Sequence, residues 1–379
     1  MNLYDVYTLF DVNLTKGQGA MVYDERGVGY LDFYGGHAVI SVGHSHPHYV
    51  KMIQDQLHRL SFYSNSVVNH LQRELADKLE KVSGSPGYEL FLINSGAEAN
   101  ENALKLASFY NGRKKIIALN NSFHGRTSAA INITHTGQKH ASPINQGVDV
   151  LYFDKDDTNG IVGNISNGDI SAVIIEPIQG VGGLDMIKKE TVQSIKNACE
   201  ETNTILIMDE VQSGYGRSGA FFAFQHLETI PDIITMAKGM GNGFPIGGVL
   251  INSDKIPAQK GRLGTTYGGN HLACSAAIAV LNIIEGEGLI ENAEKIGNMF
   301  SEELQQINGV KQVKGKGLML GAEFDFPVKD LRKNLIFNQQ VFTGSSSKPN
   351  ILRLLPPLNI TGHHVDKFLT SLKEEISKL

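Results

Sequence analysis

The sequence predicts an α/β fold in which helices cover a mainly parallel sheet and a smaller α+β domain is attached. The first observation is a series of short apolar runs that stop at polar residues, as Ile205–Met208 does before Asp209. Such runs are typical of strands buried in a parallel sheet. The second observation is that helical segments alternate with these runs, for example 189–202. The third is that the order of predicted elements changes near residue 289. From there a helix, a strand pair, a further strand and a final helix predict the smaller domain.

The other elements follow from local patterns. Two short apolar-aromatic segments flank the turn-forming residues 24–27, which predicts a β-hairpin. Leucines at 71, 75 and 79 predict an amphipathic helix over 70–82. We expect further strands at 91–94, 116–119, 172–175 and 233–237, and further helices at 49–60, at 98–110, from about 272, at 293–307 and at the C-terminus. The segment between the small-domain strand pair and the strand near 353 has no clear pattern.

Composition and charge exclude several classes of function. The chain of 379 residues has a net charge of −5 and 41% hydrophobic residues, which argues against a nucleic-acid or membrane partner. Without a secretory signal or a membrane-spanning run, we expect a cytoplasmic protein. Cys199 and Cys274 cannot form a disulfide framework, which favours a reducing compartment. We expect no metal site, because the alternating His44, His46 and His48 flank a proline and have no Cys or carboxylate cluster nearby.

Two polar residues stand where predicted strands end, and their chemistry indicates a cofactor. Asp209 follows one apolar run and Lys238 follows another, and ligands bind at the carboxyl ends of strands in open α/β sheets. A partly desolvated lysine there can act as a nucleophile. Pyridoxal 5'-phosphate forms a Schiff base with a lysine, and a carboxylate keeps its ring nitrogen protonated. The pair therefore predicts this cofactor, with an ordinary surface ion pair as the alternative.

Two loops contain further candidate binding residues. Ser95, Gly96 and Ala97 join a strand to a helix, and free N–H groups at a helix N-terminus favour a phosphate. Phe123 and Arg126 lie on the loop after the next strand, where an aromatic ring can stack on a flat ligand and an arginine can hold a carboxylate. A core phenylalanine and a solvated arginine are the alternative.

Two charged residues occupy apolar surroundings. Arg353 lies within an apolar strand, where an unpaired charge would cost several kcal/mol. It is therefore either paired or available to an anionic ligand. Glu176 ends the apolar run 172–175, directly before a proline and a glycine-rich turn.

As a set, the motifs resemble a known family. SGAEANENALK, FHGRT, EPIQG, DEVQSGYGRSG, AKGMGNGFPIGG and TTYGGNHLAC have the order and spacing of class III (ornithine-type) pyridoxal-phosphate aminotransferases. GGHAVISVGHSHP and the N-terminal hairpin look most like the acetylornithine aminotransferases of arginine biosynthesis. The resemblance covers nearly the whole chain. It implies fold type I of the pyridoxal-phosphate transferases with a seven-stranded-type sheet. It also implies a homodimer with shared active sites, a large domain over 41–274, and a small domain over 275–379 to which residues 1–40 contribute.

The resemblance also implies how the cofactor is held. Lys238 resembles the Schiff-base lysine, and Asp209 resembles the partner of the ring nitrogen. Phe123 would stack on the ring, Gln212 would bond its phenolic oxygen, and Thr266 would reach the phosphate from the other subunit. The remaining implied cofactor contacts are Ser95, Gly96, Ala97, Glu210 and Val211.

For the substrate, the resemblance implies four contacts. Arg126 would bind the carboxylate of an acylornithine, and Arg353 the α-carboxylate of glutamate or 2-oxoglutarate, with Thr265 and Glu176 nearby. The implied reaction moves the δ-amino group of N-acetyl- or N-succinylornithine to 2-oxoglutarate, giving the semialdehyde and glutamate. The alternatives are an ornithine or 4-aminobutyrate aminotransferase, a glutamate-semialdehyde aminomutase and, least favoured, a non-enzymatic module.

Three positions depart from the family pattern. Val181 stands where the family usually has a glutamate that masks the arginine equivalent to Arg353. We therefore hypothesise that Arg353 is either unmasked or neutralised by another acid. His37 and Ile40 also differ and are candidates for lining the acyl pocket, so the sequence leaves the acyl group open. The segment before the strand with Arg353 looks shortened.

Overall fold

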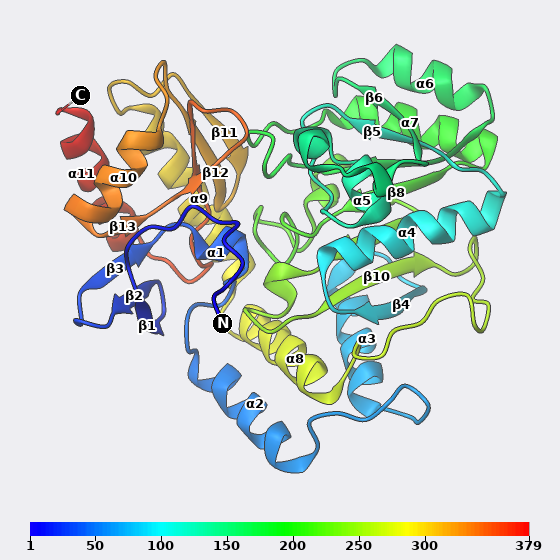
Figure 1. Cartoon of the computed structure of the whole chain (residues 1–379), viewed down its shortest axis with the longest axis horizontal. Helices are drawn as coiled ribbons and strands as arrows, with labels where there is room; N and C mark the ends of the chain where they lie inside the picture. Colours follow the sequence, from blue (N-terminus) through cyan, green and yellow to red (C-terminus); the bar gives the residue numbers. More distant parts are fainter. Residues whose placement is uncertain (379) are drawn as a thin grey trace.

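The large lobe is built on one sheet of seven strands. The computed structural model describes residues 1–378, and Figure 1 shows the large sheet in one lobe and the smaller sheets in the other. The strand order is β4-β10-β9-β8-β7-β5-β6. The strands are β4 Tyr88–Ile93, β5 Lys115–Leu119, β6 Asp149–Phe153, β7 Ile170–Ile175, β8 Ile205–Asp209, β9 Ile233–Met236 and β10 Gly247–Asn252. Strand β10 runs opposite to the other strands of this sheet, which all share one direction, and this confirms the mainly parallel seven-stranded sheet.

The central strands are buried on both faces, which explains why their sequences are continuously apolar. In β8, Ile205 and Ile207 belong to the cluster that contains the apolar face of α4. Leu206 and Met208 point to the opposite face and join the cluster that contains α7 and α8. Because successive strand residues alternate between faces, each face of the strand needs its own apolar residues.

The helices of the chain are α1 Gly35–Ala38, α2 Pro47–Arg59, α3 His70–Ser83, α4 Gly96–Asn111, α5 Ser128–Asn132, α6 Thr158–Ser166, α7 Lys189–Thr202, α8 His271–Gly286, α9 Leu289–Gln305, α10 Lys329–Gln339 and α11 Gly362–Ile376.

The small lobe contains strands from the N-terminal part and from the C-terminal part of the chain. Its strands are β1 Leu14–Gln18, β2 Met21–Asp24, β3 Gly29–Asp32, β11 Gln312–Lys316, β12 Met319–Glu323, β13 Val341–Phe342, β14 Gly344–Ser345 and β15 Ile351–Leu354. They form two sheets, β1-β2-β3-β13 and β11-β12-β15-β14. Val341 in β13 pairs with Leu31 in β3, so the N-terminal hairpin shares a sheet with the C-terminal half. The boundaries at residues 40 and 274 stay a prediction.

Most predicted elements are confirmed, and helix ends follow their capping residues. Helix α7 spans the predicted 189–202 and ends at Asn203, which is left-handed (φ 56°). The side chain of Asn270 caps α8 by accepting from the N–H of Ala273 at 2.9 Å. The segment before the strand with Arg353, for which the sequence shows no clear pattern, contains α10, β13 and β14. Within residues 1–378, no single helix is long and apolar enough to cross a membrane, although α8 and α9, bent by 63°, meet that test together.

Candidate active site

Two connected cavities lie at the carboxyl edge of the large sheet. The inner cavity, of about 320 Å³, lies between Ser95 and Asp209, and the outer cavity, of about 690 Å³, contains Arg126 and Arg353. Lys238 lines both cavities and therefore marks where they meet. The inner cavity is also lined by Gly96, Ala97, Phe123, Glu176, Val211 and Gln212. Most of the predicted site residues are thus brought together from strands that are distant in the sequence.

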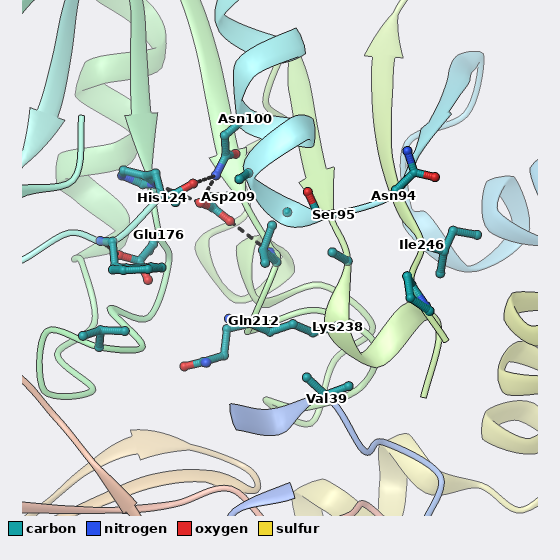
Figure 2. A pocket seen from close by; sticks show the side chains of 18 of the residues that line it. Val39, Asn94, Ser95, Asn100, His124, Glu176, Asp209, Gln212, Lys238 and Ile246 are labelled. Carbon is teal, nitrogen blue, oxygen red and sulfur yellow. Dashed lines mark hydrogen bonds and ion pairs between the residues drawn. The ribbon is translucent and has the colours of Figure 1, made fainter. Parts of the chain in front are cut away.

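Asp209, at the end of β8, is fixed by three donors. Its Oδ2 accepts from Asn100 Nδ2 and His124 Nδ1, both at 2.7 Å, as Figure 2 shows. Its Oδ1 accepts from the N–H of Val211 at 3.0 Å. Thr235 in turn donates to Asn100 Oδ1 at 2.7 Å, which orients the amide. A carboxylate held by three donors cannot rotate, so it presents its oxygens in a fixed direction to a ligand in the inner cavity.

Lys238 has an unusual backbone and a perturbed amine. It begins the 3₁₀ helix η4 (Lys238–Met240) directly after β9, and its φ of 44° places a non-glycine residue in the left-handed region. Such strain persists where the surrounding structure imposes it, often at functional sites. Burial lowers the pKa of the Lys238 amine to about 8; the negative charges of Asp209 and Glu176 oppose that shift, and Arg353 adds to it. At pH 7, roughly a tenth of the amine is therefore unprotonated and nucleophilic, compared with well under a hundredth for an ordinary lysine.

This pKa predicts how the cofactor-free protein takes up pyridoxal phosphate. Only the neutral amine attacks an aldehyde, so the rate of covalent attachment should rise with pH and level off above about 8. An ordinary lysine would level off only near 10.4. Stopped-flow absorbance between pH 6.5 and 10 measures this rate. A rate that still increases tenfold per pH unit above pH 9 would contradict the lowered pKa.

The turn before α4 forms one end of the inner cavity. Ser95 caps the helix by accepting from the N–H of Glu98 at 3.2 Å, and the N–H groups of the first turn lack helical partners. A Cβ on Gly96 would lie 2.6 Å from Val211 Cγ1, so glycine is required for this close approach. The cradle of hydroxyl and N–H groups fits a phosphate at a helix N-terminus. Nearby, Phe123 forms part of the cavity wall.

Arg353 is buried without a carboxylate partner. Its side chain is 2% exposed, and its Nη1 donates to Gly180 O at 2.8 Å and to Gln212 Oε1 at 3.3 Å, while its Nε donates to Ser345 O. Within the described chain no carboxylate lies within 4 Å of it, and no hydrogen bond uses its Nη2. Burial lowers the pKa of Arg353 to about 10, which still leaves it charged at neutral pH. Of the two hypotheses drawn from Val181, the structure favours an Arg353 that no acid neutralises.

Two buried carboxylates lie near the site, and one of them, Glu176, braces its walls. Glu176 accepts from the N–H of Phe123 at 2.8 Å and from the N–H of Gly180 at 3.0 Å, so it holds both loops in place. Burial raises the pKa of Glu176. The Glu210 carboxylate faces neither cavity, because it accepts from Ser213 Oγ at 2.6 Å and from the N–H of Phe224 at 2.7 Å.

The remaining predicted residues lie around these cavities. Gln212 lines both, and its Nε2 donates to the backbone oxygen of His37 at 3.1 Å. Arg126 is exposed at the outer cavity. Thr265 accepts from Asn94 Nδ2 at 3.4 Å beside a separate cavity, and Thr266 is exposed and lines neither cavity of its own chain. These two positions stay predictions for a site shared between subunits.

Sequence reasoning missed the residues that orient Asp209. Asn100 lies inside α4 and His124 inside the FHGR loop, and only the fold shows that both point to one carboxylate. A signal was present, because Asn is unfavourable within a helix and is retained where its side chain has a partner. The Nε2 atom of His124 is buried and has no partner among residues 1–378.

The fold and this geometry together define a pyridoxal-phosphate-dependent enzyme of the α/β type: a nucleophilic lysine and a fixed carboxylate face one cavity that ends in a phosphate-sized cradle. A family model described as aminotransferase class III matches residues 4–376. The chain belongs to the class III aminotransferases, and its cofactor is pyridoxal phosphate.

Comparison with individual proteins agrees with this assignment. The acetylornithine aminotransferase of Caldanaerobacter subterraneus subsp. tengcongensis is 38% identical over 395 residues, covering 100% of this chain and 98% of that protein. The Bacillus subtilis acetylornithine aminotransferase is 38% identical over 384 residues, covering 99% and 98%. An ornithine aminotransferase from Toxoplasma gondii, crystallised with partial occupancy of pyridoxal phosphate at its active site, superposes with a TM-score of 0.90 at 28% identity and covers 99% of this chain and 93% of that chain.

Proposed function

We propose that this enzyme transfers the δ-amino group of an N-acylated ornithine to 2-oxoglutarate, releasing the semialdehyde and glutamate, as a step of arginine biosynthesis. Several relatives with 36–39% identity over nearly the whole chain are acetylornithine aminotransferases, which supports this substrate class. The geometry supports it independently through the charges of the outer cavity.

The main structural support for an acylated substrate is the charge of the outer cavity, whose described lining contains basic residues and no acidic residue. Arg126, Lys139, Lys238 and Arg353 all line it, whereas Asp and Glu are absent from its described wall. The free α-ammonium of ornithine would lie among like charges with no carboxylate to accept its hydrogen bonds. Acylation converts that ammonium into a neutral amide, so this cavity favours an acylated ornithine over ornithine itself.

Lys238 and Asp209 carry the chemistry. When bound, pyridoxal phosphate supplies an aldehyde that takes up the substrate amine and a ring that withdraws electrons from the reacting carbon. Lys238 holds the cofactor covalently before the substrate amine displaces it, and the freed amine then moves the proton as general base and acid. Asp209, held by Asn100 and His124, keeps the ring nitrogen protonated.

Two arginines, Arg353 and Arg126, bind the carboxylates of the substrates in this proposal. Arg353 lines the outer cavity and its Nη2 has no hydrogen-bond partner in the described chain, so we assign it the α-carboxylate of 2-oxoglutarate or glutamate. Arg126, at the same cavity, holds the carboxylate of the acylornithine. The amino group is transferred in two half-reactions, so the kinetics are ping-pong.

A homodimer completes this proposal. Thr266 is exposed in the single chain, and in the proposed dimer its hydroxyl reaches the phosphate in the partner's site. The N-terminal residues Leu3, Tyr4 and Tyr7 are all more than three-quarters exposed, at 97%, 92% and 76%. A second subunit that covers such apolar side chains would gain hydrophobic free energy. We propose a cytoplasmic dimer that acts on small molecules and has no nucleic-acid or membrane partner.

The proposed function is tested by comparing half-reactions. The pyridoxal form should be converted to the pyridoxamine form by N-acetylornithine or N-succinylornithine at least tenfold faster than by ornithine or 4-aminobutyrate. Continuous turnover should require an added keto acid, whereas an aminomutase would need none. Conversion by ornithine at a rate equal to that of its acylated forms would overturn the proposal.

Replacing Val181 by glutamate should weaken the binding of 2-oxoglutarate. Val181 lines both cavities beside Arg353, so a glutamate there can pair with the unused Nη2. Losing a charge-assisted contact of about 1.5–3 kcal/mol corresponds to roughly a 10- to 100-fold higher KM for 2-oxoglutarate. Val181→Gln is the control of equal length without the charge. If Val181→Glu left both half-reaction rates unchanged, the residue at position 181 would not affect how Arg353 binds substrate carboxylates.

A further inference from the structure

The outer cavity contains Lys139, a cationic residue that the proposed substrates do not need. Its described lining includes Arg126, Lys139, His140 and Arg353, in addition to Lys238. None of these residues forms an ion pair within 4 Å in the described chain. N-acetylornithine has one carboxylate and 2-oxoglutarate has two, and the two arginines account for them. Lys139 and its neighbour His140 are then left without an anion.

These two residues are held at the cavity by a well-anchored segment. They end the 3₁₀ helix η1 (His135–His140). Thr136 donates to Ser122 O through its N–H at 3.1 Å and through its hydroxyl at 3.0 Å, and Gln138 Nε2 donates to the Tyr152 hydroxyl at 2.7 Å. Ser122 directly precedes the loop with Phe123 and Arg126, so η1 and Arg126 are fixed to the same part of the cavity wall.

We propose that Lys139, with His140 beside it, is a second anion subsite that selects an acyl group ending in a carboxylate. This inference rests on the proposed function, because it names the class of acylornithine that the same cavity accepts. With the α-carboxylate on Arg126, a dicarboxylic acyl chain places its free carboxylate near Lys139. An acetyl group has no charge for this subsite.

Binding is measured with ligands that cannot react. N-succinyl-L-norvaline and N-acetyl-L-norvaline correspond to the two acylornithines without the δ-amine, so they bind the cofactor-loaded enzyme without turnover. By calorimetry in low salt, we expect the succinyl compound to bind about tenfold more tightly in the wild type. Lys139→Gln should abolish this preference and leave the Kd of the acetyl compound within about twofold. The preference should also shrink as salt screens the exposed lysine.

Lys114→Gln is the matched control, because Lys114 is an exposed lysine that precedes β5 at the opposite edge of the sheet. It should retain the tenfold preference. His140→Gln should reduce the preference less than Lys139→Gln does. Equal binding of the two compounds to the wild type, or a preference that survives Lys139→Gln, overturns the subsite.

Failure of the subsite can be told apart from failure of the proposed function. If N-acetylornithine is converted in the half-reaction while the two norvaline compounds bind equally, the transaminase function stands and the subsite is wrong. If neither acylornithine is converted, the proposed function itself fails.

Discussion

Replacing Lys238 by alanine is expected to reduce the first half-reaction by at least about 10³–10⁴-fold. In the proposed mechanism, the substitution removes the covalent attachment of the cofactor and the group that moves the proton, and no other lysine of the described chain lines the inner cavity. Rapid mixing of loaded enzyme with N-acetylornithine measures the rate. The absorbance near the visible edge that covalent attachment gives should also be lost.

Two further measurements distinguish a loss of catalysis from a loss of folding in the Lys238→Ala variant. Lys114→Ala, which removes an exposed lysine far from the site, should leave the rate unchanged. Small primary amines added to Lys238→Ala should restore part of the proton transfer, because they can enter the space that the side chain vacates. A folded Lys238→Ala variant with more than about a tenth of the wild-type rate would remove Lys238 from its assigned role.

The parts of the fold that depend on burial on both faces could be predicted from the sequence. The runs that became β7, β8 and β9 are continuously apolar because helices cover both faces, and they stop where the chain reaches the cavity. Asp209 and Lys238 could therefore be placed at one edge of one sheet from the sequence alone. The cap at Ser95 was equally local, because an N-cap hydroxyl and the first-turn N–H groups belong to neighbouring residues.

Other features could not be predicted, because they depend on contacts between distant segments. Helix α10 has a weak apolar face, and it is held through packing on α11 rather than by its own pattern. Strand β10 begins with Gly247 and Gly248, which are poor strand formers, and its place is fixed by pairing on both sides. The neutral oxygens around Arg353 come from residues that are between 8 and 173 positions away. The sequence alone left open whether that arginine was paired.

Replacing Asp209 by asparagine should lower kcat by roughly 10²–10³-fold while the cofactor still attaches to Lys238. The amide oxygen can still accept from Asn100 and His124, so the side chain keeps its position. In the proposed mechanism, the substitution removes the negative charge that keeps the ring nitrogen protonated. The ring then withdraws electrons less effectively, and proton removal by the lysine becomes slower.

The asparagine also changes stability, and this effect must be measured separately. Its NH₂ group would face the N–H of Val211, which now donates to Asp209 Oδ1 at 3.0 Å. Leaving that donor unpaired costs about 1–3 kcal/mol in the free energy of unfolding. Asp232→Asn is a suitable control, because Asp232 is a buried carboxylate of the same sheet that pairs with Lys196 and Lys255 away from the cavities. It should reduce stability without reducing kcat per folded molecule. If both variants lost the same fraction of kcat, the effect at Asp209 would be structural. A loss confined to Asp209→Asn, with the lysine-bound cofactor retained, is the result that assigns the charge to catalysis.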